Sequence, residues 1–280
     1  MMQPNQAPRI IIKDATRDST IWRDIKLRPT DIIICSAYKT GTTLTQQIAN
    51  LIINGKDDFE SIHLFSPWVE TLITPIKVSP KAIENFSDRR ILKSHLPFDA
   101  LPYSSDCKYI YLARDGKDVC ISLYNHHSSY LDNTKNTSKN FPEFWDKWIT
   151  TGEPWYSIWE HIQSWWQVRN LPNVMLLHYD TIINYKSEVV DKIASFIGVE
   201  LTPEQKEIVL YKSSFNYMKE NWQKFQPPQN FKPKTFINKG KNGLWKGILS
   251  DEQIEKYEKV LVEKLEPKCA DWVKHGGFLI

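Results

Sequence analysis

Cysteine is scarce in this sequence. The 280 residues contain four cysteines, Cys35, Cys107, Cys120 and Cys269, and no two of them form a CxxC pair. None has a close histidine partner in the sequence, so neither a zinc site nor a disulfide framework is expected. Unpaired cysteines are typical of a reducing compartment, and the cytoplasm is therefore the expected location.

Long apolar runs are also missing. No window of the sequence reaches the roughly 18 apolar residues that a membrane-spanning helix needs. Residues 1–9 contain no apolar stretch of the kind found in a secretory signal. The sequence therefore predicts no association with a membrane.

Neither sign of charge dominates. Lys and Arg number 36 and Asp and Glu number 33, which gives a formal net charge of +3. This balance excludes a protein that binds nucleic acid through overall basicity, and no nucleic-acid partner is expected. Hydrophobic residues make up 41% and charged residues 25%, which is typical of a folded domain with a substantial core.

Short apolar segments alternate with helical patterns along the chain. Four runs rich in Ile, Val and Tyr suit buried parallel strands: residues 32–35, 91–92, 109–113 and 174–177. Five stretches show helical periodicity: residues 43–54, 118–130, 155–169, 188–197 and 251–265. This alternation indicates a parallel sheet covered on both faces. Since no linker divides the chain, we expect one α/β domain over residues 1–280, in which residues 1–25 form an N-terminal extension.

One segment departs from this alternation. Residues 221–250 contain prolines and glycines without a clean period, and they carry six lysines but no Asp or Glu. Long irregular segments are commonly functional loops, and a local excess of cations is most effective near a polyanion. A solvated basic loop is the alternative.

The first chemical signature lies between the run 32–35 and the helix expected from residue 43. Its sequence is Ser36-Ala-Tyr-Lys-Thr-Gly-Thr-Thr43. A helix N-terminus offers unpaired N–H groups and a partial positive charge, which attract phosphate. Lys39 adds a full charge, and Thr42 and Thr43 offer hydroxyls that cap the helix or contact phosphate oxygens. The loop therefore predicts a phosphate site, with an ordinary helix cap beside an exposed lysine as the alternative.

The order of residues in this loop differs from that of a Walker A loop. In GxxxxGK[ST] the lysine follows the second glycine, whereas Lys39 precedes Gly41 and no glycine stands five residues earlier. This order weakens the interpretation as an ATPase or a kinase. It resembles the 5′-phosphosulfate-binding loop of the cytosolic sulfotransferases, TYPK[SA]GTTW.

A second polar cluster, Lys93-Ser-His-Leu-Pro97, follows the run 91–92. Lys93 and His95 share a face because residues two apart in an extended chain point the same way. Side chains at the carboxyl end of a strand lie where open α/β sheets bind ligands. A lone histidine is more often structural than functional. The cluster, however, resembles the family's K[TS]HLP, whose histidine is the catalytic base.

A third block runs from Lys108 to Tyr124 and reads as a strand, a turn and a helix. Arg114 stands at the end of the strand, and its guanidinium carries a fork of N–H donors that suits phosphate. Ser122 offers a hydroxyl from the helix. Alternatively, Arg114 pairs with Asp115 or Asp118 and Ser122 lies on the surface. The block resembles the family's 3′-phosphate motif, Y[LV]xR[ND]xKDVxxSxY, at nearly every fixed position.

Over about residues 28–247 the chain therefore resembles the cytosolic sulfotransferases that use 3′-phosphoadenosine-5′-phosphosulfate (PAPS). The resemblance implies a single α/β domain with a central parallel five-stranded sheet flanked by helices, similar to the P-loop nucleotide kinases. It implies in-line transfer of a sulfuryl group from PAPS to a hydroxyl or amine nitrogen of a small-molecule acceptor, without a metal. It also makes residues 221–250 a mobile lid over the nucleotide.

The resemblance assigns roles to individual residues. His95 becomes the general base, Lys39 stabilises the charge on the bridging oxygen, and Lys93 supports the sulfuryl oxygens. The expected nucleotide-binding residues are Lys39, Thr40, Gly41, Thr42, Thr43, Leu44, Arg114, Ser122, Tyr179, Ser213, Phe215, Met218, Asn238, Lys239 and Gly240. The candidates for the acceptor pocket are Phe65, Trp68, Glu70, His126, His127, Tyr130, Trp155 and Trp222. For the aromatic residues the alternative is the core, and for Glu70 it is a solvated carboxylate.

The chain also departs from the family pattern. Leu44 stands where a tryptophan stacks on adenine, so we expect Phe215 and Tyr179 to hold the base. Tyr38 replaces a proline and Asn238 an arginine. The family's dimer motif survives only as two residues, and we expect a monomer or a weak homodimer.

Two other functions remain open on the sequence. A Mg²⁺-dependent small-molecule kinase on a related fold would also use a phosphate loop. A nucleotide-binding module without catalysis would explain the loop, but it gives no reason for a histidine beside Lys93. The acceptor is defined only as a small aromatic or polycyclic metabolite.

Overall fold

The structure, a computed structural model, describes residues 5–73, 76–86, 89–130, 140–153, 156–227 and 232–279. The strands are β1 (Asn5–Gln6), β2 (Ile32–Ser36), β3 (Ile91–Ser94), β4 (Tyr103–Ser104), β5 (Lys108–Ala113) and β6 (Val174–His178). The helices up to β6 are η1 (Ser19–Asp24), α1 (Thr42–Asn54), α2 (Ile62–Phe65), α3 (Pro80–Glu84), η2 (Phe98–Ala100), α4 (Gly116–His127), α5 (Phe141–Thr151) and α6 (Ile158–Trp166). Those after β6 are α7 (Tyr179–Asn184), α8 (Lys186–Phe196), α9 (Pro203–Lys212), α10 (Phe215–Glu220), α11 (Trp222–Phe225), α12 (Asp251–Lys264) and α13 (Pro267–His275).

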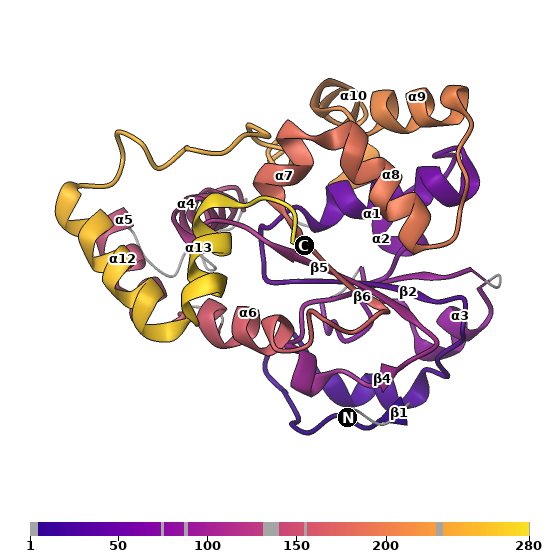
Figure 1. The fold of residues 1–280 in the computed structure, drawn as a ribbon, viewed down its shortest axis with the longest axis horizontal. Helices are drawn as coiled ribbons and strands as arrows, with labels where there is room; N and C mark the ends of the chain where they lie inside the picture. Colours follow the sequence, from indigo (N-terminus) through magenta and orange to yellow (C-terminus); the bar gives the residue numbers. More distant parts are fainter. Residues whose placement is uncertain are drawn as a thin grey trace.

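A parallel sheet forms the centre of the molecule, with strands in the order β3-β2-β5-β6 (Figure 1). Each of these strands contains one of the four apolar runs expected from the sequence. The predicted α/β domain with a central parallel sheet is confirmed.

The described sheet has four strands rather than the five that the family resemblance implied. Beyond β3 the described residues form only one parallel bridge, between Trp68 and Lys93. There the Lys93 amide donates to the Pro67 carbonyl, and the Val69 amide donates to the Lys93 carbonyl. Pro67 has no N–H to donate, so the ladder does not continue along this edge.

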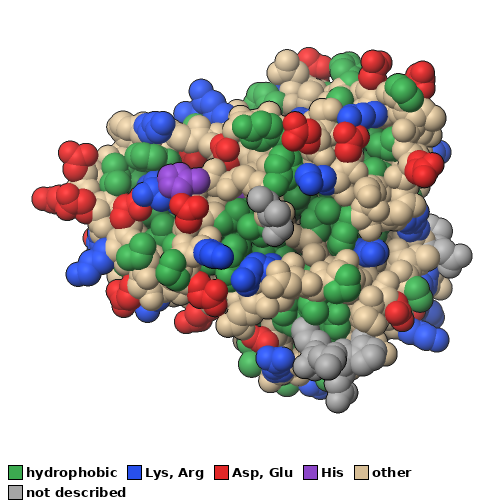
Figure 2. All heavy atoms as spheres, in the orientation of Figure 1, with side chains coloured by type: hydrophobic (Ala, Val, Ile, Leu, Met, Phe, Trp, Pro, Cys, Tyr) green, Lys and Arg blue, Asp and Glu red, His purple; other side chains and the backbone are tan. Residues whose placement is uncertain are grey.

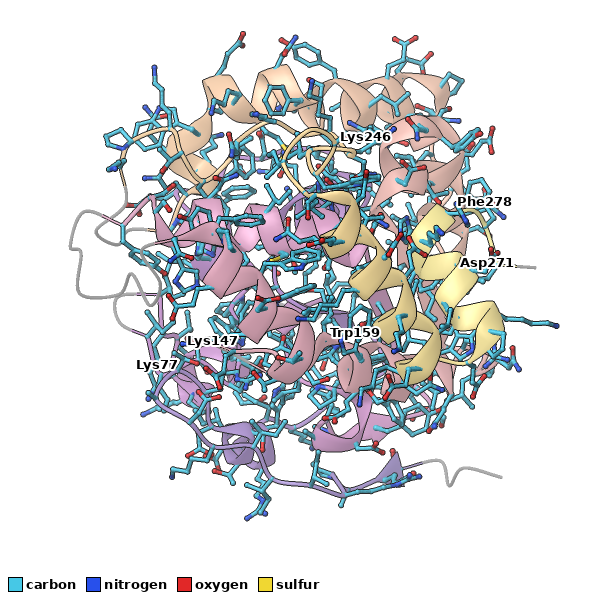
Figure 3. All side chains as sticks on the ribbon, turned by 90° about the vertical axis from the view of Figure 1, so that its left-hand side faces the viewer. Lys77, Lys147, Trp159, Lys246, Asp271 and Phe278 are labelled. Atoms are coloured by element: carbon cyan, nitrogen blue, oxygen red, sulfur yellow. The ribbon has the colours of Figure 1, made fainter. Side chains whose placement is uncertain are left out.

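Helices cover both faces of the sheet because alternate residues of each strand point to opposite sides. Ile32 and Ile34 of β2 pack with α1, α8 and α9 on one face. Ile33 and Cys35 face a second core, which is rich in tryptophan from α5 and α6. Figure 3 shows α12 and α13 side by side at the end of the chain, and Tyr257 of α12 packs against Trp159 of α6 with ring centroids 5.6 Å apart.

Three helices of nine residues or more were not expected from the periodicity of the sequence, namely α5, α9 and α13. Each of them has a proline in its first turn. Proline suits the start of a helix because its fixed φ matches the helix and the missing N–H would be unpaired there. These prolines were the local signal that helical periodicity alone did not provide.

The N-terminal segment packs into the domain. β1 pairs antiparallel with β4, and Trp22 of η1 is buried. Arg17 is also buried and donates to the backbone carbonyl of His95. Residues far upstream of β3 therefore support the polar cluster that follows this strand.

Within the described ranges, no helix is long and apolar enough to cross a membrane. Figure 2 shows Lys, Arg, Asp and Glu side chains interspersed on one face, with hydrophobic side chains between them. This mixture agrees with the small net charge of +3.

Candidate active site

The candidate site lies at the carboxyl ends of the parallel strands. The loop after β2 carries Lys39, His95 follows β3, Arg114 follows β5, and Tyr179 follows β6. The helices that follow β2 and β5, α1 and α4, pack on opposite faces of the sheet, so the ends of these two adjacent strands flank a crevice. Such a switch point is the usual ligand site of an open α/β sheet.

The phosphate loop, residues 36–43, contains two residues with a left-handed backbone conformation. Lys39 has φ 64° and Gly41 has φ 103°. A Cβ atom on Gly41 would lie 2.6 Å from the Tyr179 ring, so only glycine fits here. Gly41 caps α1 without a side-chain bond, which corrects the expectation that Thr42 or Thr43 caps the helix. The Thr42 hydroxyl instead lies 2.6 Å from the Ser36 hydroxyl.

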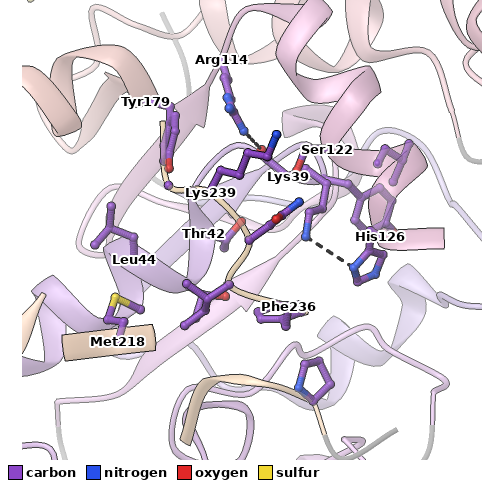
Figure 4. Close-up of a pocket in the computed structure, with 18 of the residues that line it drawn as sticks. Lys39, Thr42, Leu44, Arg114, Ser122, His126, Tyr179, Met218, Phe236 and Lys239 are labelled. Atoms are coloured by element: carbon purple, nitrogen blue, oxygen red, sulfur yellow. Dashed lines mark hydrogen bonds between the residues drawn. The ribbon is translucent and has the colours of Figure 1, made fainter. Parts of the chain in front are cut away.

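The Lys39 side chain points into the pocket (Figure 4). Its Nζ lies 3.4 Å from Nδ1 of His126 and 4.8 Å from the centre of the Phe236 ring. Burial, together with the positive charges of Arg114 and Lys93, lowers the pKa of Lys39 to about 7. An anion bound beside this amine would raise its pKa and hold it protonated.

His95 is buried and has a defined tautomer. Its Nδ1 lies 2.8 Å from the Ser36 carbonyl oxygen, which can only accept a hydrogen bond. Nδ1 therefore carries the proton, and Nε2 is left as the basic nitrogen. Burial and the nearby Lys93 keep the pKa of His95 well below its usual value, so the ring is neutral. Tyr38 and Trp68 pack against it, with ring centroids 4.5 and 4.9 Å from that of His95.

Lys93 is a buried cation that lines the same pocket. Its Nζ lies 5.3 Å from the centre of the Trp68 ring, and none of the described carboxylates forms an ion pair with it. Burial lowers the pKa of Lys93 to about 8, while the charge of Glu70 opposes this shift. A buried ammonium without an ion pair favours an anionic ligand.

Arg114 joins the phosphate loop to the lysine-rich residues 221–250, here called the basic segment. Its guanidinium donates to the Lys39 and Lys241 carbonyls at 3.3 and 3.0 Å and to Oδ1 of Asn242 at 3.0 Å. It also lies over the Tyr179 ring, 4.4 Å from its centre. No ion pair joins Arg114 to Asp115 or Asp118 in the described structure, so that alternative is wrong.

The basic segment lies against this side of the pocket. Both carboxylate oxygens of Asp118 accept from its backbone, at 2.8 Å from the amides of Gly243 and Leu244. Gly240 has φ 63°, and a Cβ atom there would lie 2.2 Å from the Phe215 ring. This fit requires glycine and brings the segment onto α10.

One cavity of about 300 Å³ brings most of the expected site residues together. It is lined by His95, Lys93, Trp68, His126 and Tyr130 and by every expected nucleotide-binding residue except Thr40. The Thr40 hydroxyl is buried and donates to the Ala37 carbonyl. The lining includes five lysines and Arg114, and none of the lining residues in the described part of the chain is acidic.

Several acceptor-pocket candidates do not line this cavity. Glu70 is fully buried because its carboxylate points into the core, where it accepts hydrogen bonds from the indoles of Trp22 and Trp68. His127 is buried against Phe144 of α5, with ring centroids 6.0 Å apart, since it leaves α4 on the core side. Phe65 and Trp222 are also absent from the lining, and Trp155 lies outside the described residues.

The cavity also contains residues that the sequence did not indicate. Among them are Tyr38, His63, Lys186, Phe236, Ile237 and Lys241. His63 lies on α2 and donates from Nε2 to the Phe225 carbonyl, and Lys186 begins α8 and donates to the Ser213 carbonyl. Both reach the cavity through helix packing and lie in no local motif. For Lys241 the run of lysines after residue 221 was the available signal.

Metal ligands do not gather in the part of the chain that the structure describes: no group of three or more His, Cys, Asp or Glu side chains could hold an ion.

Comparisons with known proteins identify the family of this chain. The sequence model of a family described as "Sulfotransferase domain" matches residues 29–268. Sulfotransferase 1 family member D1 of Mus musculus is 32% identical over 254 residues, covering 85% of this chain and 84% of that protein. The 3-beta-hydroxysteroid sulfotransferase of Cavia porcellus is 31% identical over 258 residues, with coverage of 86% and 87%.

Solved structures share the fold. The mouse sulfotransferase SULT7A1 complexed with PAP aligns with a TM-score of 0.76 at 19% identity, covering 96% of this chain and 99% of that chain. A retinol dehydratase in complex with retinol and PAP aligns with a TM-score of 0.73 at 23% identity, with coverage of 89% and 84%.

Proposed function

The chain belongs to the sulfotransferase family, and from this membership we propose which residues carry out the transfer. The enzyme moves a sulfuryl group from PAPS to a small-molecule acceptor. We propose that His95 is the general base and that Lys39 and Lys93 are the catalytic cations. The observation that carries this proposal is a neutral His95 with a basic Nε2, lining the same cavity as both lysines.

The donor set of the cavity fits an anionic nucleotide. PAPS carries several negative charges, and the described lining offers six cationic side chains without an acidic one. The Ser213 hydroxyl is buried and has no hydrogen-bond partner in the described structure. The first-turn amides of α1, beyond Gly41, would hold the 5′-phosphate together with the hydroxyls of Thr42 and Thr43. Arg114, Ser122 and Lys239 would hold the 3′-phosphate.

His95 would remove the proton from the acceptor. A neutral imidazole whose Nδ1–H is fixed by a carbonyl has one basic nitrogen, and His95 lines the cavity with Tyr38 and Trp68 packed against its ring. A base positioned in this way accelerates proton transfer by a factor of about 10²–10⁴. After the transfer the proton returns to solvent.

Lys39 and Lys93 would oppose the negative charge that develops as the bond to the leaving phosphate breaks. PAPS, when bound, supplies the activated sulfuryl group. Amines with a lowered pKa become fully charged when an anion is beside them, and in a buried site their charge is weakly screened. We assign Lys39 to the leaving oxygen and Lys93 to the sulfuryl oxygens.

The acceptor part of the cavity is aromatic. Tyr38, Trp68, Tyr130 and Phe236 line it, which suits a flat aromatic or polycyclic compound. The cations and the lack of a described carboxylate in the lining disfavour a positively charged acceptor. We therefore propose a neutral or anionic acceptor with a nucleophilic hydroxyl or amine.

The experiment that tests this function is a screen of neutral, anionic and cationic acceptors with PAPS. Transfer is detected as a mass increase of one sulfuryl group in the acceptor. Activity that persists in EDTA supports metal-independent transfer. Loss of activity in EDTA, or transfer only with ATP and Mg²⁺, would favour the kinase alternative.

We also propose that residues 221–250, of which 228–231 lie outside the described residues, close over the nucleotide as a lid. The contacts of Arg114 and Asp118 with this segment support that role. A monomer or weak homodimer in the cytoplasm remains our prediction, supported for the location by four free and buried cysteines. Sedimentation velocity at several protein concentrations tests the oligomeric state.

A further inference from the structure

Glu70 accepts four hydrogen bonds in the core beside the active site. Its Oε1 accepts from the Trp68 indole at 2.5 Å, the His95 amide at 2.7 Å and the Ser94 hydroxyl at 3.2 Å. Its Oε2 accepts from the Trp22 indole at 2.9 Å. These donors come from three separate parts of the chain, so Glu70 joins the N-terminal segment to the end of β3.

The carboxylate of Glu70 has no ion-pair partner among the described side chains. Burial raises the pKa of Glu70, and hydrogen bonds from His95, Trp22 and Trp68 oppose this shift. All four donors are neutral groups that stabilise the ionised form. The four donors thus favour a negative charge on Glu70, directly behind Trp68, and the Lys93 Nζ lies 5.3 Å from the centre of that ring.

We propose that Glu70 is a positioning residue for the transfer reaction, which holds His95 and Trp68 in place and supplies a buried negative charge behind the Trp68 ring against which Lys93 packs. The proposal rests on the roles proposed for His95 and Lys93. It replaces the expected contact of Glu70 with the acceptor, since Glu70 does not line the cavity.

Several other ionisable groups interact electrostatically with the Lys93 amine or with the Glu70 carboxylate. The groups that interact electrostatically with Lys93 are Lys39 on the phosphate loop, His63 on α2, His95 after β3 and His126 on α4. The groups that interact electrostatically with Glu70 are Lys93 on β3, Cys35 on β2, Tyr38 on the phosphate loop and Tyr156 before α6. Lys39 has a pKa of about 7 and titrates in the same range as Lys93, so the test needs a background in which only Lys93 is removed.

The variant Glu70→Gln separates charge from geometry. The amide oxygen can keep the three bonds that Oε1 accepts, but its NH₂ group faces the Trp22 indole, which is also a donor. The variant therefore loses the charge and one hydrogen bond. Trp22→Phe is the matched control, because it removes the same hydrogen bond and leaves the charge. Glu70→Asp keeps the charge and shortens the reach to His95.

The first measurement is calorimetric affinity for the product nucleotide, 3′-phosphoadenosine-5′-phosphate, against pH. A negative charge favours protonation of a neighbouring amine, so its removal lowers the pKa of Lys93. As pH rises, we expect the affinity of Glu70→Gln for the nucleotide to fall about one pH unit below the pH at which that of the wild type falls. Near pH 6 the two affinities should be equal. We expect Trp22→Phe to lower the melting temperature without moving the profile. In a Lys93→Met background the shift caused by Glu70→Gln should disappear.

The second measurement is the pH profile of kcat/KM in the same variants. Glu70→Gln should move the alkaline limb in the same direction, and Glu70→Asp should keep both limbs and lose about tenfold in kcat. The proposal is overturned if the Glu70→Gln profile coincides with that of the wild type, or if its shift persists without Lys93. Absence of sulfuryl transfer by the wild type would instead overturn the proposed function, and the binding profile is independent of that result.

Discussion

Nδ1 of His95 lies 2.8 Å from the backbone carbonyl oxygen of Ser36, which places the proton of the ring on Nδ1. The same Ser36 offers its hydroxyl 2.6 Å from that of Thr42, at the start of α1. The candidate base and the phosphate loop are thus held by one residue at the end of β2. This arrangement fixes the orientation of His95 through a backbone carbonyl on its ring.

The affinity for the product nucleotide should fall as pH rises. The pKa values of Lys39 and Lys93 are lowered to about 7 and about 8, so both amines are protonated below these values and neutral above them. Between about pH 7 and 9, above the second phosphate ionisation, we expect a loss of affinity of at least tenfold. Binding should also take up protons, which calorimetry in two buffers of different ionisation enthalpy measures.

Lys39→Met is the control for this pH dependence. It should remove part of the proton uptake, since Lys93 still titrates. An affinity that is constant over this pH range, with no proton uptake, would show that neither amine contacts the nucleotide.

Leu44→Trp should tighten nucleotide binding. Leu44 lies in the first turn of α1 and lines the cavity near Met218 (Figure 4). An indole here can stack on the base, and stacking of this kind contributes about 1–3 kcal/mol, or roughly 5-fold to 150-fold in Kd. Calorimetry with the product nucleotide measures the change, with Leu44→Ala as the control. Unchanged or weaker binding would mean that another residue already covers that face of adenine.

The nucleotide should protect residues 223–245 from hydrogen exchange if they form a lid. The described part of this segment is held to the domain by Arg114, Asp118 and Asp180, and the amides of Gly243 and Leu244 both donate to Asp118. Asp118→Ala removes these two bonds, each worth about 1.5–3 kcal/mol when the acceptor is charged. We expect it to reduce the protection that the nucleotide induces.

Asp146→Ala, at an exposed acid of α5, is the matched control for this exchange experiment and should leave protection unchanged. Equal exchange with and without the nucleotide in the wild type would rule out a nucleotide-gated lid.

Motifs at strand ends were the part of the site that the sequence predicted well. Lys39, His95 and Arg114 were expected to converge because each follows a parallel strand, and all three line one cavity. The carboxyl ends of adjacent parallel strands meet at one edge, so a local pattern there has a predictable place in three dimensions.

Glu70 and His127 show where such reasoning fails. Glu70 stands two residues after Trp68, but its carboxylate turns to Trp22, 48 residues upstream. His127 follows His126, yet one residue faces the core and the other the cavity, because neighbours on a helix point about 100° apart. These directions depend on which element packs alongside. No signal in the local sequence reveals that partner.

The role of His95 is the central claim, and single-turnover transfer by His95→Ala tests it most directly. The variant should bind the product nucleotide with wild-type affinity, which shows that the pocket is folded. It should transfer the sulfuryl group at least about 100-fold more slowly, because the variant lacks the basic Nε2 that would remove the acceptor proton. Transfer at the wild-type rate by a variant that binds the nucleotide normally would contradict the proposed mechanism.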